Sequence, residues 1–295
     1  MIPPLASRFV AGESIPAAVA HVERLNDAGI AAAVNNLGSH VEAYERAADA
    51  TRTYQTLATT LADDDLAASI AVKPTQLGLD LGEDAFRESI RTIVTTADRK
   101  NVDVWIDMEE PETVDATLDA FESLSETFGD SVGVCLQADL HRTPDDLERI
   151  AGRSGKLRLV KGGAYDVGPG RAYQDRSRID SAYRELLESA FEMVDNGLAV
   201  ATHDPEMIDH ATALHDRCGT DFEIQMLMGV RTKAQSELAD AYTVTQYVPY
   251  GEQWQRWFLN RARSNLRFAT RAVGGAIVDA ASGVVAGSND RHTRS

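Results

Sequence analysis

The strongest constraint on the fold is the regular alternation of short apolar runs with longer amphipathic stretches along most of the chain. Eight such runs, rich in small and β-branched residues, occupy residues 30–36, 68–74, 102–108, 132–137, 156–162, 198–204, 222–227 and 242–249. A strand that is apolar along its length is buried on both faces, which is typical of a parallel sheet covered by helices. Eight strand–helix units predict an α/β fold, a closed (βα)8 barrel, because a six-stranded doubly wound sheet leaves strands unused.

The segments at the two ends of the barrel sequence also have helical patterns. Residues 14–29 predict an extra helix before the first strand, and residues 252–264 predict a C-terminal helix that forms a lid over the barrel mouth. We see no interdomain linker, so we predict a single domain over residues 1–295 with a frayed polar tail at 283–295. The chain lacks a signal-peptide pattern and any apolar run of the roughly 18 residues that cross a membrane, which predicts a cytoplasmic protein.

The charge composition excludes some partners. The formal net charge is −17, from 29 Lys and Arg against 46 Asp and Glu, which argues against nucleic acids and anionic membranes. An excess of Asp with only five lysines resembles proteins of salt-loving archaea, so a halophilic protein is expected. Scarce lysine makes any lysine kept in an apolar strand a candidate for a specific role. Cys135 and Cys218 are too far apart in sequence to suggest a disulfide framework or a metal pair.

Polar side chains recur where the apolar runs end. They are Asn35, Asn36, Lys73, Asp107, Gln137, Lys161, Thr202, His203, Asp204, Gln225 and Tyr247. Barrels carry their chemistry at the carboxyl ends of the strands, and a polar group in an apolar strand is costly unless it is paired. Any one of these residues could be a satisfied structural residue, but their recurrence on nearly every strand favours a shared site.

The residues alone leave several chemistries open. No G-x-G-x-x-G or Walker loop is present, and the glycine-rich stretch 162–170 does not open directly into a helix, so a nucleotide cofactor would have to bind at the barrel mouth. Lys73 or Lys161 could form a Schiff base, although Arg158 near Lys161 suits an anion better. We predict no metal site, because His203 is the one histidine at a predicted strand end and barrel metal sites usually need several ligands.

Seven stretches together resemble the proline dehydrogenase family, whose members are flavin enzymes on a distorted (βα)8 barrel. They are VKPTQLGLD, IDMEE, VCLQADLHRT, LRLVKG with AY, ATHD, FEIQMLMGVR and YVPYG, in the family's order. The resemblance extends from about residue 8 to about residue 275 and is greatest to haloarchaeal members, in agreement with the acidic composition. It implies FAD as the cofactor and a small imino acid as the substrate.

On the substrate side, the resemblance implies that Lys73 pairs with the substrate carboxylate and that Asp107, a catalytic residue, stands by the substrate and supports Lys73. The residues implied to enclose or pack on the substrate ring are Tyr165, Leu227 and Tyr247. Arg261 matches one of two adjacent arginines that clamp the carboxylate, and Asn260 takes the place of the other. Losing one arginine of a desolvated clamp costs on the order of 2–5 kcal/mol if the other parts stay fixed.

On the cofactor side, the resemblance implies that Arg158, a catalytic residue, lies near the reactive middle of the flavin, where positive charge stabilises the reduced, anionic ring. The implied cofactor-binding residues are Met108, Gln137, Lys161, Gly162, Gly163, Ala164, Thr202, His203 and Gln225. The second glycine of the pair at 162–163 is an insertion relative to the usual family sequence and predicts a shift of Tyr165 by one position.

The expected activity is oxidation of L-proline to Δ1-pyrroline-5-carboxylate by hydride transfer to flavin N5, in proline catabolism. Electrons then pass to a quinone or another acceptor, and membrane contact is expected only through that acceptor. Two alternatives follow from Asn260: a dehydrogenase for a related cyclic amine or modified proline, and a flavin-binding pseudoenzyme or regulatory paralogue. A barrel lyase that uses Lys161 is a more distant alternative.

Overall fold

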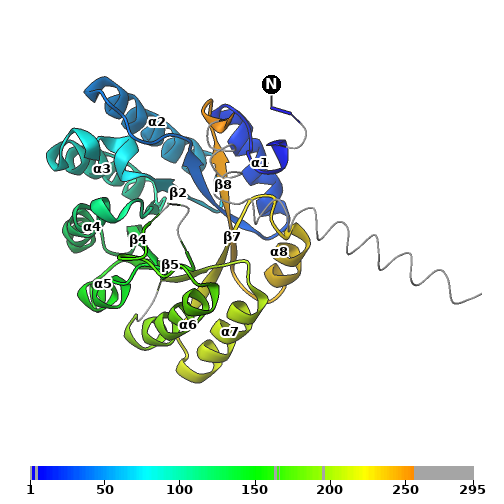
Figure 1. Ribbon diagram of the computed structural model, residues 1–295. Helices are drawn as coiled ribbons and strands as arrows, with labels where there is room; N and C mark the ends of the chain where they lie inside the picture. Colours follow the sequence, from blue (N-terminus) through cyan, green and yellow to red (C-terminus); the bar gives the residue numbers. More distant parts are fainter. Residues whose placement is uncertain (1, 4–5, 163–164, 166, 195–196, 256–295) are drawn as a thin grey trace, which may run out of the picture. The chain divides into compact units, whose positions relative to one another are not determined.

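The protein forms a closed barrel of eight parallel strands that are paired in chain order, β1 to β8 (Figure 1). This computed structural model describes residues 2–3, 6–162, 165, 167–194 and 197–255. The strands are β1 Ala31–Asn36, β2 Ala68–Val72, β3 Val104–Ile106, β4 Val132–Gln137, β5 Lys156–Val160, β6 Leu198–Ala201, β7 Phe222–Leu227 and β8 Val244–Tyr250. The predicted (βα)8 barrel is therefore confirmed.

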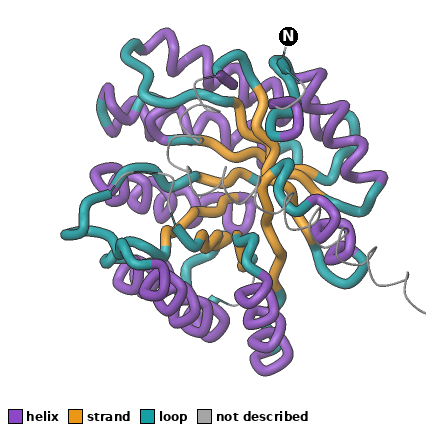
Figure 2. The backbone as a smooth tube through the Cα atoms, turned by 45° about the vertical axis from the view of Figure 1, so that its right-hand side comes forward, coloured by secondary structure: helices purple, strands orange, loops and turns teal. Residues whose placement is uncertain are grey.

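Helices surround the barrel on its outside (Figure 2). They are α1 Ile15–Asp27, α2 Tyr44–Asp63, α3 Glu83–Asp98, α4 Val114–Phe128, α5 Thr143–Ile150, α6 Arg176–Met193, α7 Pro205–Cys218 and α8 Thr232–Ala239. Short 3-10 turns are η1 Ala6–Arg8, η2 Pro74–Leu77, η3 Leu79–Leu81, η4 Pro111–Thr113 and η5 Gly129–Ser131. The helix expected before the first strand is α1. The predicted lid helix at 252–264 lies outside the described residues from position 256 onward.

Two of the helices that follow the site strands begin with a side-chain N-cap. Asp175 accepts hydrogen bonds from the backbone N–H groups of Ser177 and Arg178 at the start of α6. Asp204 does the same for Glu206 at the start of α7, where Pro205 occupies the first turn. An Asp at this position satisfies N–H groups that the helix itself leaves unpaired. The two caps therefore fix where α6 and α7 begin.

The main apolar core lies between the sheet and the helices, because alternate strand residues face outward. Ile70 and Val72 of β2 belong to it, whereas Ala71 between them belongs to a separate small cluster inside the barrel with Trp105, Ala199 and Tyr247. Successive side chains of a strand point to opposite faces of the sheet. The interior of the barrel is thus left to a few small residues, two aromatic rings and polar groups.

Several predicted strands end earlier in the structure than the apolar runs suggest. β3 ends at Ile106 and β6 at Ala201, so Asp107 and the segment 202–204 begin the following loops. The polar residues singled out at the ends of these two runs are therefore loop residues that directly follow the strands.

The unit that contains the barrel comprises residues 1–254. Of the remaining segment the structure describes Gln255 alone, so the single-domain prediction and the frayed tail at 283–295 stay predictions. Within the described part of the chain, no helix has both the length and the apolar character needed to cross a membrane.

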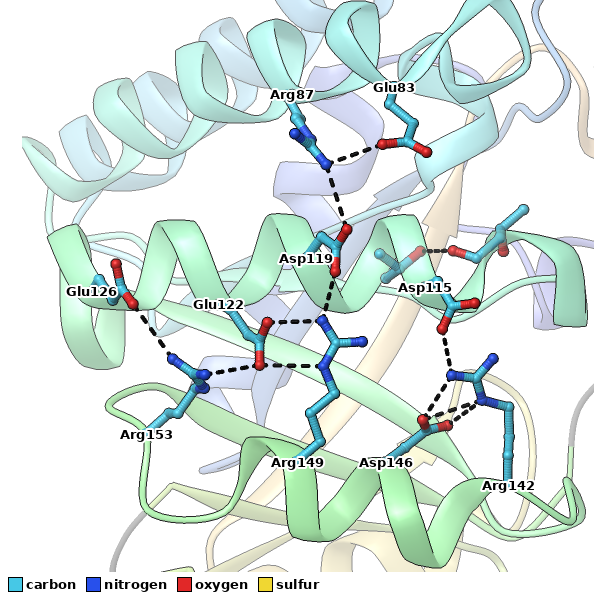
Figure 3. A network of polar contacts seen from close by, with 12 residues as sticks. Glu83, Arg87, Asp115, Asp119, Glu122, Glu126, Arg142, Asp146, Arg149 and Arg153 are labelled. Carbon is cyan, nitrogen blue, oxygen red and sulfur yellow. Dashed lines mark hydrogen bonds and ion pairs between the residues drawn. The ribbon is translucent and has the colours of Figure 1, made fainter.

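A network of ion pairs joins α3, α4 and α5 on the outside of the barrel (Figure 3). At its centre Arg149 of α5 pairs with Asp119 and Glu122 of α4, at 2.6 and 2.8 Å. At one end Arg142 donates to both oxygens of Asp146, at 2.8 and 3.1 Å. Most of these groups are partly exposed, but Asp146 is buried. Arg142 is therefore the member whose loss leaves a carboxylate without compensation away from water.

Replacing Arg142 with alanine is expected to lower the free energy of unfolding by about 1.5–3 kcal/mol, because hydrogen bonds to charged groups contribute this much and Asp146 remains buried. Urea unfolding followed by circular dichroism measures the change. Arg52→Ala is the matched control, since Arg52 pairs with Asp49 on the exposed surface of α2. We expect that control to unfold at the wild-type urea concentration, and equal losses in the two variants would contradict this interpretation.

Candidate active site

An arginine and a tyrosine from two strands and an aspartate that directly follows a third strand meet inside the barrel toward the carboxyl ends of the strands. Arg158 of β5 donates from Nη1 to Oδ1 of Asp107 at 2.7 Å. Tyr247 of β8 donates its hydroxyl to the other carboxylate oxygen at 2.6 Å. Burial, together with the charge of Asp107, raises the pKa of Tyr247 well above its usual range, so the phenol keeps its proton and remains a donor. Both oxygens of Asp107 are therefore engaged.

The guanidinium of Arg158 is almost fully buried, at 3% exposure, and lies 4.5 Å from the centre of the Trp105 ring. The Tyr247 ring is 5.7 Å away on the same group. Two of its nitrogens, Nε and Nη2, have no hydrogen-bond partner among the described residues. A buried cation with free N–H donors is costly, unless a bound group supplies acceptors. The isoalloxazine ring of a flavin carries carbonyl oxygens and ring nitrogens that accept hydrogen bonds, so these donors fit FAD, the cofactor that the resemblance implies.

A second carboxylate, Glu109, lies at the mouth of the barrel and was not identified from the sequence. It is fully buried and accepts from the backbone N–H and the hydroxyl of Thr75, at 2.8 and 3.0 Å. The hydroxyl of Tyr165 donates to it at 3.3 Å. Burial raises the pKa of Glu109, and the charge of Lys73 opposes that rise. The one sequence signal was its position two residues after Asp107.

The charge of Lys73 acts on Glu109, while the two oxygens of Asp107 are bonded to Arg158 and Tyr247. The implied support of Lys73 by Asp107 stays a prediction. The hydroxyl of Tyr165 contacts Glu109, so its side chain points to the barrel mouth.

The residues implied to bind the cofactor fall into two groups. One group contacts the barrel strands and the loops that follow them, and the other lies against the surrounding helices. Gln137 is buried and donates from Nε2 to the backbone oxygen of Met108 at 3.2 Å, which joins the ends of β4 and β3. His203 accepts from the backbone N–H of Leu227 at 3.3 Å through Nε2, which places its ring proton on Nδ1. Gln225 is buried inside the barrel and donates to Glu223 at 2.6 Å.

Lys161 belongs to the second group, which lies against the surrounding helices. Its ammonium contacts Asp180 of α6 and Asp204 at the start of α7, both at 2.5 Å. The hydroxyl of Thr202 accepts from the backbone N–H of Asp204 at 3.1 Å, so Asp204 is held by a second contact. Two carboxylates form ion pairs with the ammonium of Lys161, so this residue links the end of β5 to α6 and α7. This arrangement gives no support to the Schiff-base interpretation.

Gly162, also predicted to bind the cofactor, is exposed just after the end of β5. Gly163, Ala164, Asn260 and Arg261 lie outside the described residues. Among the described residues, no group of three or more His, Cys, Asp and Glu side chains could hold a metal ion.

A pH dependence of stability follows from Glu109. Its pKa is raised in the folded protein, so its contribution to stability is present below the pKa of the unfolded chain, about 4.3, and is lost as the pH rises through the folded value. We expect Glu109→Gln to remove this fall, so the variant gains stability relative to the wild type between roughly pH 4 and neutrality. Urea unfolding at several pH values measures the difference. Glu45→Gln, on the exposed surface of α2, is the control and should follow the wild type, and a parallel curve for Glu109→Gln would contradict the assignment.

The chain is similar to known proteins over most of its length. The family model described as proline dehydrogenase matches residues 18–256. Proline dehydrogenase 2 of Bacillus subtilis (strain 168) is 34% identical over 91% of this chain and 90% of its own length. Proline dehydrogenase 1 of the same organism is 34% identical over 87% of this chain and 85% of its own. Proline dehydrogenase of Deinococcus radiodurans is 33% identical over 92% and 90%.

Solved structures show the same fold. Proline utilization A (PutA) from Bdellovibrio bacteriovorus, inactivated by N-propargylglycine, has a TM-score of 0.80 over 88% of this chain and 32% of that chain, at 22% identity. PutA from Corynebacterium freiburgense has a TM-score of 0.77 over 90% and 31%, at 20% identity. This chain thus spans about a third of these longer proteins. The family match and the full-length relatives together show that the chain belongs to the proline dehydrogenase family.

Proposed function

We propose that this member of the proline dehydrogenase family oxidises L-proline to Δ1-pyrroline-5-carboxylate with FAD as its cofactor. A quinone or another acceptor then takes the electrons. The observation that carries the proposal is the buried guanidinium of Arg158, whose Nε and Nη2 have no hydrogen-bond partner among the described residues. When bound, FAD supplies the acceptor for the hydride that leaves the carbon next to the substrate nitrogen.

The residues around Arg158 have complementary tasks in this proposal. Arg158 supplies positive charge where electron density increases during the reaction, and a preformed charge in a dry site is worth far more than in water. Asp107 has both oxygens occupied, so it holds the guanidinium and the Tyr247 hydroxyl in place. The ring of Tyr247 packs beside the guanidinium and excludes water.

The substrate offers one carboxylate and one apolar ring. Lys73 lies at the end of β2 and supplies a cation for the carboxylate, with Arg261 as the second cation that the resemblance implies. Tyr165 and Leu227 supply apolar surface for the ring. Arginine forks match carboxylates, so the asparagine at 260 in place of a second arginine favours a substrate whose acid group needs less charge. A related cyclic amine or modified proline is the second candidate for this reason.

Restoring the arginine pair separates these two substrates. If L-proline is the substrate, Asn260→Arg is expected to lower KM for L-proline by a factor of tens to thousands, because the second arginine of such a clamp contributes about 2–5 kcal/mol. Steady-state rates with L-proline and with pyrrolidine, which lacks the acid group, measure the effect. Activity on pyrrolidine above that on L-proline in the wild type would favour the second candidate.

Product formation tests the proposed reaction itself. The purified protein, kept in high salt and supplied with FAD, is incubated with L-proline and an artificial quinone. We expect a cyclic imine that reacts with o-aminobenzaldehyde to give a yellow adduct. Bound FAD without imine from L-proline or from its analogues would overturn the proposal in favour of the pseudoenzyme.

A further inference from the structure

Trp105, in the middle of β3, is the largest side chain inside the barrel and was not identified from the sequence as a functional residue. It is 3% exposed and packs with Ala71, Ala199 and Tyr247 in a cluster separate from the main core. Its ring takes the space beside Gly133 of β4, where an added Cβ would come within 2.4 Å of the indole. Glycine at 133 therefore makes room for the ring between the strands.

The ring has Arg158 on one side and a cavity on another. The guanidinium lies 4.5 Å from the ring centre. The cavity, of about 420 Å³, lies among the amino-terminal ends of the strands, at the opposite end from the site, and Trp105 lines it together with Asp103, Lys156, Glu223 and Thr245. Asp221 also lines the cavity, and its side chain is 94% exposed, so the cavity reaches the surface.

We propose that Trp105 is a positioning residue that forms the floor of the active site. It holds the guanidinium of Arg158 by stacking and separates that guanidinium from the cavity at the amino-terminal end. Because the effect is exerted through Arg158, the inference rests on the proposed function, in which Arg158 stabilises the reduced cofactor. Nothing in the family match requires this role of the tryptophan.

Stacking matters because the described residues hold the guanidinium of Arg158 by a hydrogen bond on one edge. Asp107 binds Nη1, while Nε and Nη2 have no partner among the described residues. Stacking on an aromatic face fixes the plane of a guanidinium without using its N–H donors. A smaller residue at 105 joins the cavity to the guanidinium and admits water. Water weakens the field of a charge severalfold relative to a dry interior.

The first test measures the FAD midpoint potential of the holoenzyme in wild type, Trp105→Leu and Trp105→Phe. For Trp105→Leu we expect the preference for reduced over oxidised FAD to fall by about tenfold, which is the order of a desolvated cation–π contact. For a two-electron couple this equals a fall of about 30 mV. Trp105→Phe keeps an aromatic face, so its midpoint potential should lie close to the wild-type value. Phe86→Leu, which also replaces a buried aromatic ring with leucine but in the outer core, is the control and should keep the wild-type potential.

The second test needs no cofactor. The apoprotein is treated with phenylglyoxal, and modification of Arg158 is followed by mass spectrometry against the exposed Arg52. We expect Arg158 to be protected in wild type and in Phe86→Leu and to lose that protection in Trp105→Leu. Unchanged protection and an unchanged midpoint potential in Trp105→Leu would overturn the floor role. Absence of FAD binding in the wild type would instead contradict the proposed function, and the labelling would still decide the role of Trp105.

Discussion

Replacing Arg158 with methionine is expected to lower kcat/KM for L-proline by about 10²–10³-fold, the usual loss when one preorganised electrostatic group is removed from a site. Arg158 is the buried cation of the barrel interior that is bonded to Asp107 and stacked on Trp105. Methionine has a similar length and no charge, so packing is largely retained. Steady-state kinetics with L-proline at saturating acceptor measure the loss.

A lysine at the same position is the matched control. It keeps the charge but lacks the planar fork that both bonds to Asp107 and stacks on the ring. The kcat/KM of Arg158→Lys for L-proline should therefore lie between the values of the wild type and Arg158→Met. Equal rates in Arg158→Met and the wild type, with FAD bound in both, would remove Arg158 from the reaction.

Replacing Asp107 with alanine is expected to destabilise the protein by about 3–5 kcal/mol, because breaking a buried pair leaves an uncompensated charge in the interior. Tyr247 also loses the acceptor of its 2.6 Å hydrogen bond. Urea unfolding of the apoprotein measures this cost without any contribution from the cofactor. The double variant Asp107→Ala with Arg158→Met should recover part of the loss, since it removes the unpaired cation as well.

Asp103→Ala is the control for that prediction. Asp103 precedes β3 and pairs with Lys156 of β5. This ion pair joins the same two strands as the Asp107–Arg158 pair, but at their amino-terminal ends. Its side chain is 39% exposed, and exposed pairs contribute only about 0–1 kcal/mol. A loss in Asp107→Ala no greater than in Asp103→Ala would mean that the interior pair is not desolvated as described.

The barrel could be predicted from the sequence because each strand has its own local signal. Continuous apolar runs between turn signals are properties of a few neighbouring residues, and eight of them leave little choice of fold. Strand ends were less predictable, since Met108 looks like a continuation of an apolar run, whereas β3 ends at Ile106.

The partners within the site could not be predicted from local patterns. Trp105 is indistinguishable in sequence from a core residue of an apolar strand, and its significance depends on Gly133 and Arg158 on the next strands. Lys161 was recognised as unusual, but its carboxylate partners come from α6 and from the start of α7. Such pairings depend on which face of a strand a residue occupies, and a shift of one residue reverses that face.

The most direct test of the central claim is the flavin spectrum of the purified holoenzyme in high salt, recorded without oxygen before and after addition of L-proline. The account predicts that the yellow absorbance of oxidised FAD bleaches with L-proline in the wild type and bleaches far more slowly in Arg158→Met. Bound FAD that stays yellow in the wild type, with L-proline and with its cyclic analogues, would contradict it.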